Sequence, residues 1–171
     1  AATLKPIDLI QLRGLSEDVA VSSLADGAKL QGAYLSLLGG VAWMIITRMD
    51  ICIYVVALQR VAKDPKVIHF RRLNRVLSYV QRNPRSLEYR KMPQPIQLIA
   101  VADSAFKKED EEALVMRGCA IALAHKRKDS RSKVCFDLHV LEYFSKRQRH
   151  VVRSTWAAEL FNLVDAVDLG V

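Results

Sequence analysis

Two acidic residues stand in apolar surroundings and are the first candidates for chemistry in this sequence. Asp103 ends the apolar run IQLIAVAD, and Glu159 lies in the second turn of an apolar stretch that begins at Ser154-Thr155. Carboxylates that converge from separate elements can hold a hard divalent cation such as Mg²⁺. Each acid also has a simpler explanation: Asp103 can be a solvated strand-end acid, and the helix dipole favours an acid near the start of a helix, as at Glu159.

The elements that must position these acids follow a period of two in the second half of the chain. The runs IQLIAVAD, MRGCAIALA and VCFDLHVLEYF predict three strands, and HKRKDSRSK predicts a loop between the second and the third. In the third strand Val134, Phe136, Leu138 and Val140 share one face. Three hairpin-connected strands followed by a helix indicate an α+β fold.

The last helix is predicted to start at Ser154, whose hydroxyl is a suitable N-cap. The helical period then gives it a core stripe of Trp156, Leu160, Leu163 and Val167. Residues on the same face as Glu159 would be Asn162, Leu163 and Ala166, whereas Asp165 and Asp168 point elsewhere. The helix therefore supplies Glu159 with no second carboxylate.

The first half of the chain is predicted to be helical. Residues 30–63 predict two helices interrupted near 47–50, and residues 69–81 predict a third with Phe70, Leu73, Val76, Leu77 and Val80 on one side. The prolines of RNPRS and KMPQP end this part of the chain, because proline disfavours helix at the residue before it. We therefore divide the chain into a lead-in segment (1–30), a helical connection region (31–92) and an α+β domain (93–171).

The net charge of +8 favours an acidic partner such as nucleic acid or an anionic surface. Residues 60–91 hold ten basic and two acidic residues, and residues 126–153 hold nine basic and three acidic residues. A solvated surface would explain two such blocks equally well. The predicted nucleic-acid-binding residues are those that lie opposite the apolar stripe of the third helix or in the predicted loop: Arg71, Arg72, Arg75, Lys126, Arg127, Lys128, Arg131 and Lys133.

Three cysteines without CxxC spacing favour reduced, buried thiols, and hence an intracellular reducing compartment. The four histidines are scattered, which disfavours a histidine metal site. Residues 30–47 carry no charge after Lys29 and approach the length of a membrane span, but Gln31, Ser36 and Gly39-Gly40 favour a buried helix. A weaker alternative is a small membrane-associated subunit that uses this run.

Seven short segments, in order across residues 33–160, resemble the junction of reverse transcriptase and ribonuclease H in copia-type retrotransposon polyproteins. That family typically reads YRSLVGSLLYL, TRPDI, RVLRYLKGT, YSDADWA, SGYVFFLG, ISWKSKKQ and SSTEAEY. The corresponding segments here are Tyr34–Gly40, Thr47–Ile51, Arg75–Val80, Val101–Phe106, Arg117–Ala120, Tyr143–Gln148 and Ser154–Glu159.

The resemblance implies a partial ribonuclease H-like fold, with Asp103 and Glu159 as catalytic, metal-binding acids. Ribonuclease H cuts the RNA strand of an RNA–DNA hybrid with two divalent ions that lie roughly 3.5–4 Å apart. This sequence departs from the family pattern at three of these positions. Met49 replaces the family's proline, and Ala105 and Ala157 replace two of its acids, which reduces the number of carboxylates available for metal binding. A further family Asp lies on a strand that would follow Val171, and the polymerase motif of an aromatic residue and two aspartates is absent.

We therefore expect a retrotransposon-derived ribonuclease H-like fragment that is inactive alone and would use Mg²⁺ if active. Its expected partner is an RNA–DNA hybrid, RNA or a larger protein assembly rather than a membrane. The alternative is a repurposed, non-enzymatic structural subunit of a large ribonucleoprotein, organellar or membrane assembly.

Overall fold

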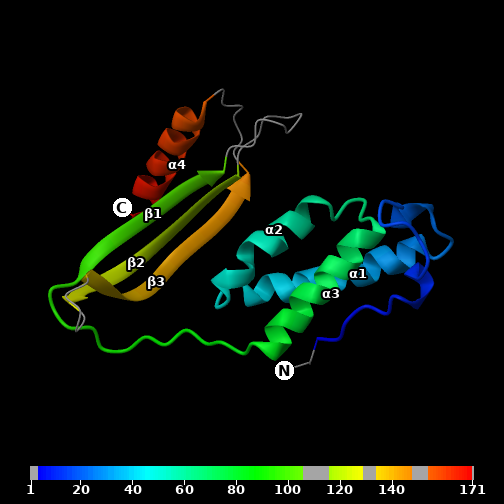
Figure 1. Cartoon of the computed structure of the whole chain (residues 1–171), viewed down its shortest axis with the longest axis horizontal. Helices are drawn as coiled ribbons and strands as arrows, with labels where there is room; N and C mark the ends of the chain where they lie inside the picture. Colours follow the sequence, from blue (N-terminus) through cyan, green and yellow to red (C-terminus); the bar gives the residue numbers. More distant parts are fainter. Residues whose placement is uncertain (1–3, 106–115, 129–133, 148–153, 171) are drawn as a thin grey trace. The chain divides into compact units, whose positions relative to one another are not determined.

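The computed structural model describes residues 4–105, 116–128, 134–147 and 154–170. The chain forms two compact units, Ala1–Leu87 and Glu88–Val171 (Figure 1). The first is helical and the second pairs a sheet with a helix, so the chain is α+β as the sequence predicts. Each unit is described by itself below.

In its described residues, the helical unit has three α-helices and three short 3-10 helices. The α-helices are α1 (Gly27–Met44), α2 (Cys52–Arg60) and α3 (Val67–Arg82). The 3-10 helices are η1 (Ile10–Leu12), η2 (Val21–Ser23) and η3 (Met49–Ile51). The predicted interruption near residues 47–50 is confirmed, because η3 separates α1 from α2.

The core of this unit gathers one side of each α-helix. Tyr34 of α1 and Phe70 of α3 are fully buried, and their ring centroids lie 4.9 Å apart. The predicted apolar stripe of α3 is confirmed at Phe70, Leu73, Val76 and Leu77, all buried, with Val80 partly buried against the same core. The helix α1 likewise buries Leu37 and Val41 in this core. Among the residues that the structure describes, no helix is both long and apolar enough to span a bilayer.

The described part of the second unit forms an antiparallel sheet in the order β1-β2-β3, followed by one helix. Its elements are β1 (Gln97–Ala105), β2 (Met116–Lys128), β3 (Val134–Arg147) and α4 (Thr155–Gly170). Asp103 pairs with Gly118 across β1 and β2. The pairing of β2 with β3 shifts register between Ile121 and Ala122, the position of a bulge.

The prediction that Lys126, Arg127 and Lys128 lie in a loop is wrong. They end β2, because antiparallel pairing continues to Phe136, Cys135 and Val134 of β3. Arg131 and Lys133, which belong to the same predicted set, lie outside the described residues.

The predicted core stripe of α4 is also wrong. Trp156 is 73% exposed, and Leu160, Leu163 and Val167 are exposed as well. The helix instead buries Ala158, Asn162 and Ala166. Small side chains let the helix backbone approach the sheet closely, which a stripe of Trp and Leu would prevent.

This orientation of α4 predicts that Trp156→Ala changes the free energy of unfolding by less than about 1 kcal/mol, because the indole is already in solvent. Ala166→Leu, a change on the buried side, is expected to cost about 1–3 kcal/mol through overpacking. Urea unfolding followed by circular dichroism measures both. If Trp156→Ala lowered the free energy of unfolding by about 3 kcal/mol or more, the indole would be buried, as the predicted core stripe requires.

Residues 88–96, the later part of the segment between α3 and β1, belong to the sheet unit. The Tyr89 hydroxyl donates a 2.7 Å hydrogen bond to the Val140 carbonyl, and the Arg90 amide donates to Nε2 of His139 at 3.2 Å. These bonds attach the segment to β3. The division between the two units therefore falls at Leu87, before the boundary near residue 93 that the prolines predict.

Candidate functional site

The two candidate acids lie on the elements that meet at the β1–α4 contact. The Ser104 hydroxyl donates to the Ala158 carbonyl at 3.2 Å, and Ala102 packs against the buried cluster of Cys119, Ile121 and Ala166. Because strand side chains alternate, these contacts place the even-numbered residues of β1 on the face that α4 covers.

Asn162 fastens this contact at its centre. Its side chain is fully buried, and Nδ2 donates to the carbonyl of Asp103 at 2.7 Å and to that of Gly118 at 3.0 Å. One amide thus joins α4 to two neighbouring strands at the level of Asp103. A buried amide with these partners is a fixed feature of the site, since removing one partner of a buried hydrogen bond costs about 1–3 kcal/mol.

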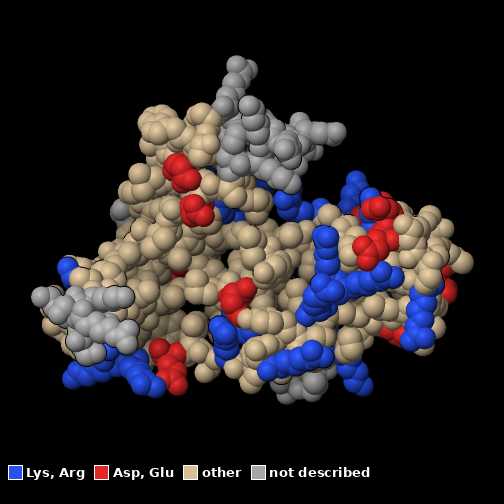
Figure 2. Space-filling model, viewed as in Figure 1, with Lys and Arg blue, Asp and Glu red and all other residues tan. Residues whose placement is uncertain are grey.

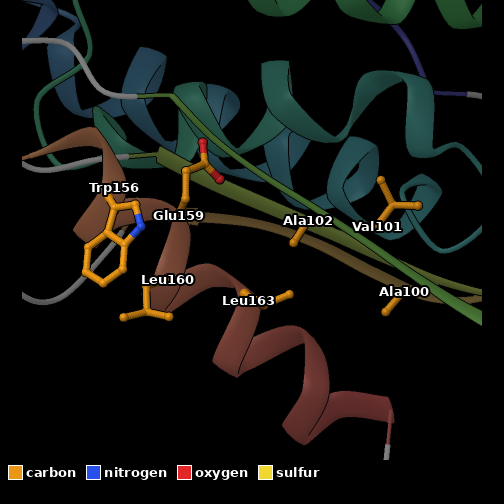
Figure 3. Close-up of a pocket in the computed structure, with 7 residues that line it drawn as sticks. All are labelled: Ala100, Val101, Ala102, Trp156, Glu159, Leu160 and Leu163. Atoms are coloured by element: carbon orange, nitrogen blue, oxygen red, sulfur yellow. The ribbon is translucent and has the colours of Figure 1, made fainter.

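Glu159 enters the site from the first turns of α4. Ser154 lies in the predicted N-cap position directly before the helix, and its Oγ accepts a 3.2 Å hydrogen bond from the Ala157 amide. Glu159 is half-buried and lines a hollow of about 490 Å³ with Ala100, Ala102 and Trp156, among others. In Figure 3 its side chain extends from α4 toward the strands, whereas the Trp156 ring points away from them. The carboxylate therefore stands at the border between the buried side of α4 and solvent.

Asp103 meets α4 through its backbone. Its side chain is exposed, and strand alternation places that side chain on the face of β1 opposite Ser104. The structure thus brings the main chain of Asp103 to α4 and directs its carboxylate away from the covered face. Because β1 is an end strand of the described sheet, ions can approach either face along its edge. The pairing of the two carboxylates stays a prediction.

A third acid nearby, Asp165, is engaged by cations. Its Oδ2 lies 2.7 Å from Nη1 of Arg117 and 3.4 Å from Nζ of Lys146. Within the described ranges, no three His, Cys, Asp or Glu side chains form a group suited to a metal ion. Asp103 and Glu159 have the hard oxygen donors that magnesium prefers, but two carboxylates fit a single ion rather than a pair.

The predicted nucleic-acid-binding residues differ in how they are engaged. In α3, Nη1 of Arg71 lies 2.8 Å from Oε1 of Glu17, whereas Arg72 and Arg75 are exposed and line a groove. In β2, Lys126 is exposed and Nε of Arg127 lies 3.1 Å from Asp137. Figure 2 shows Lys and Arg side chains spread over the helical unit among acidic ones. Their role in binding stays a prediction, and the side chain of Lys128 lies outside the described part.

Sequence reasoning missed a partly buried ionic cluster at η3, with Arg48 at its centre. Arg48 is 5% exposed, and its Nε and Nη2 donate to the two carboxylate oxygens of Asp50, each at 2.9 Å. Nη1 donates to the Asn83 carbonyl at 2.9 Å, and the Tyr79 hydroxyl donates to Oδ2 of Asp50 at 3.0 Å. The hydrogen bond from Arg48 is the main cause that lowers the pKa of Asp50 to about 2. The segment TRMDI, which contains Arg48 and Asp50, is the sequence signal for this cluster. It stands out only because it resembles the family segment TRPDI.

The chain is similar to a transposon Pol polyprotein. The match is to "Retrovirus-related Pol polyprotein from transposon RE1" of Arabidopsis thaliana, with 27% identity over 139 residues, or 80% of this chain. The chain spans 9% of the length of that curated relative. No family model matches the chain, and no solved structure matches it. The similarity to the Pol polyprotein supports a retrotransposon-derived fragment.

Proposed function

We propose that this chain is a copia-type, ribonuclease H-like fragment that does not hydrolyse RNA by itself. The similarity to a transposon Pol polyprotein supports the retroelement part of this proposal. The order of three antiparallel strands and a helix, with Asp103 on β1 and Glu159 in the second turn of α4, supports the ribonuclease H-like part. Its nucleic-acid partner is an RNA–DNA hybrid or RNA.

Asn162 is the observation that carries the inactivity. It stands three residues after Glu159, on the same side of α4, where a second helix carboxylate would face the strands. Its amide nitrogen is committed to the carbonyls of Asp103 and Gly118. The nearest acid further along the helix, Asp165, is neutralised by Arg117 and Lys146. The contact between α4 and β1 is thus built for packing rather than for gathering charge.

Asp103 and Glu159 would hold one magnesium ion only if their carboxylates met at the edge of β1, and the position of the Asp103 side chain on the face that α4 does not cover disfavours this arrangement. A bound divalent ion would polarise a phosphate oxygen and lower the pKa of a bound water. Hydrolysis in the family requires two ions, and the donor set described here does not fit a second. We therefore derive no catalytic step through the metal.

The proposal predicts that the purified chain does not cut a labelled RNA–DNA hybrid above background in magnesium or manganese. Denaturing gel electrophoresis of the labelled RNA strand measures cleavage, with Asp103→Asn and Glu159→Gln as matched variants. Equal background in all three proteins is the expected result. Cleavage by the wild-type chain that both variants abolish would overturn the proposal and establish a nuclease.

The second candidate is a non-enzymatic building block of a larger assembly. The exposed apolar side of α4, which includes Trp156, Leu163 and Val167, favours it. Large apolar patches on a surface mark contacts with other molecules. Metal-dependent cleavage that requires Asp103 and Glu159 would exclude this candidate as the primary role.

A further inference from the structure

A groove of about 710 Å³ lies between α2 and α3 in the helical unit. This volume is within the range of about 300–1,000 Å³ that is usual for ligand sites. Leu58 and Val76, both buried, contribute to its apolar lining, together with Ala57 and Val61. The lining residues come from one contiguous part of the chain and lie far in sequence from Asp103 and Glu159.

One wall of the groove carries positive charge. Arg72 and Arg75 lie three residues apart on α3, so they share one side of the helix, and both line the groove. Neither takes part in the salt bridges found among the described residues, whereas Arg71 is paired with Glu17. Two exposed guanidinium groups on a concave surface attract phosphate, which they can bind bidentately.

His69 lies on the same wall, and its pKa responds to the positive charge there. Its Nδ1 accepts a 2.9 Å hydrogen bond from the Lys66 amide, so the neutral ring carries its proton on Nε2. Burial lowers the pKa of His69, and the charges of Arg72 and Lys66 lower it further. An anion bound beside Arg72 would offset these charges and raise that pKa.

Two tyrosines add aromatic surface to the same groove. Tyr54 of α2 is 59% exposed, and Tyr79 of α3 is 39% exposed. Tyr79 is held in place, because its hydroxyl donates to Asp50 at 3.0 Å and Arg48 lies 5.7 Å from its ring centroid. Asp50 also lines the groove, but its negative charge is offset by Arg48. The groove thus combines unpaired cations with exposed rings.

We propose that the α2–α3 groove binds single-stranded nucleic acid, with Arg72 and Arg75 on phosphates and Tyr54 and Tyr79 stacking on bases. Cationic grooves with aromatic platforms bind single strands in this way. The bases of a duplex are stacked on one another. The phosphates of a duplex could therefore contact the two arginines, but its bases could not stack on the tyrosines. This site rests on the proposed function, because it is a binding site for the nucleic-acid partner named there. It lies in the helical unit and does not include Asp103 or Glu159.

The test uses the full chain and a fluorescein-labelled twelve-residue oligothymidylate, with binding followed by anisotropy across a salt series. The double variant Arg72→Gln/Arg75→Gln is expected to flatten the slope of log affinity against log salt by roughly 1.4, at about 0.7 per phosphate contact on single strands. Tyr54→Ala is expected to weaken binding by about 5- to 150-fold with an unchanged slope, the equivalent of 1–3 kcal/mol of stacking. Tyr54→Phe keeps the ring and is expected to bind like the wild-type chain.

Arg82→Gln is the matched control, because Arg82 is an exposed arginine of the same helix that does not line the groove. It is expected to keep affinity within about threefold and the slope within about half a unit. Asp103→Asn and Glu159→Gln are expected to bind the oligonucleotide normally, which separates this site from the ribonuclease H-like proposal. Histidine NMR is expected to show a higher pKa for His69 when the strand is bound.

Three outcomes would overturn the inference. The wild-type chain would show no binding at about 50 mM salt, the low end of the usual range. Alternatively, the double arginine variant would keep the full slope, or Tyr54→Ala would bind as tightly as Tyr54→Phe. Circular dichroism of each variant confirms that it is folded, which is expected because Tyr54, Arg72 and Arg75 are all exposed.

Discussion

Replacing Asp50 with alanine is expected to lower the free energy of unfolding of the helical unit by about 3–5 kcal/mol. The change leaves the guanidinium of Arg48 without its carboxylate partner in a site where Arg48 is 5% exposed. It also removes the acceptor of the Tyr79 hydroxyl. Hydrogen exchange of amides in α1 and α3 measures the free energy of opening for this unit alone.

Asp18→Ala is the matched control for this change. Asp18 lies 3.7 Å from Lys66, but its side chain is 89% exposed, so the loss of that pair is expected to cost less than about 1 kcal/mol. A similar small cost for Asp50→Ala would show that Arg48 finds other partners or reaches water.

The same pair gives the helical unit a pH dependence with a defined sign. The pKa of Asp50 is lowered to about 2 in the folded chain, from an ordinary value of 3.8. The carboxylate therefore stabilises the fold above pH 3.8, and this contribution is lost as the pH falls toward 2. The Asp50→Ala variant is expected to lose less stability over this interval than the wild-type chain.

Phe70→Ala is expected to cost about 3–5 kcal/mol, the usual range for truncating a large, fully buried aromatic residue. Phe70 is 0% exposed and lies against Tyr34, whose hydroxyl donates to the buried Leu58 carbonyl at 3.0 Å. The cavity would thus open between α1 and α3, beside the hydrogen bond that joins α1 to α2. Hydrogen exchange again provides the measurement.

Trp43→Ala is the control for Phe70→Ala, since it truncates an aromatic residue of the same unit that is 76% exposed. It is expected to change the free energy of unfolding by less than about 1 kcal/mol. Equal effects of the two truncations would mean that the core is not centred on Tyr34 and Phe70.

The sequence predicts the elements best where polar and apolar residues separate clearly. In α3, arginines alternate with Phe70, Leu73 and Val76 at helical spacing, so only one side of the helix can be buried, and that side is the buried one. The strands follow from their period of two, and their antiparallel order follows from short connections. These features depend on the spacing of polar and apolar residues within short segments, which can be read directly from the sequence.

The orientation of α4 could not be predicted in the same way. The helix is apolar over most of its surface, so hydrophobic periodicity does not select one side. The orientation of α4 is determined instead by two features of its contact with the sheet. Ala158 and Ala166 allow the helix to approach the sheet closely, and Asn162 donates hydrogen bonds to two strand carbonyls. Both depend on where β1 and β2 place their backbone, which a helix sequence does not reveal.

The candidate site shows the same division. Glu159 was identified from an acid in an apolar helix, and its half-buried position beside Ala100 and Ala102 agrees with a place at the sheet border. The Arg48–Asp50 pair was missed because arginine is ordinarily exposed, and two charges two residues apart do not predict burial. Its partners lie far away in sequence: Tyr79 is 29 residues from Asp50, and Asn83 is 35 residues from Arg48.

The placement of all the helical core within the first unit has a consequence for the order of events on the ribosome. Every buried residue of that core lies between Leu12 and Leu77, so the helical unit has its complete set of partners before the sheet is synthesised. At about 5–20 residues per second, it has several seconds to fold while β1 to α4 are still being made. The sheet unit must wait for its last element, because Cys119 and Ile121 are buried with Ala166 of α4. A chain truncated before α4 would therefore have a complete helical unit but would leave the sheet residues Cys119 and Ile121 uncovered.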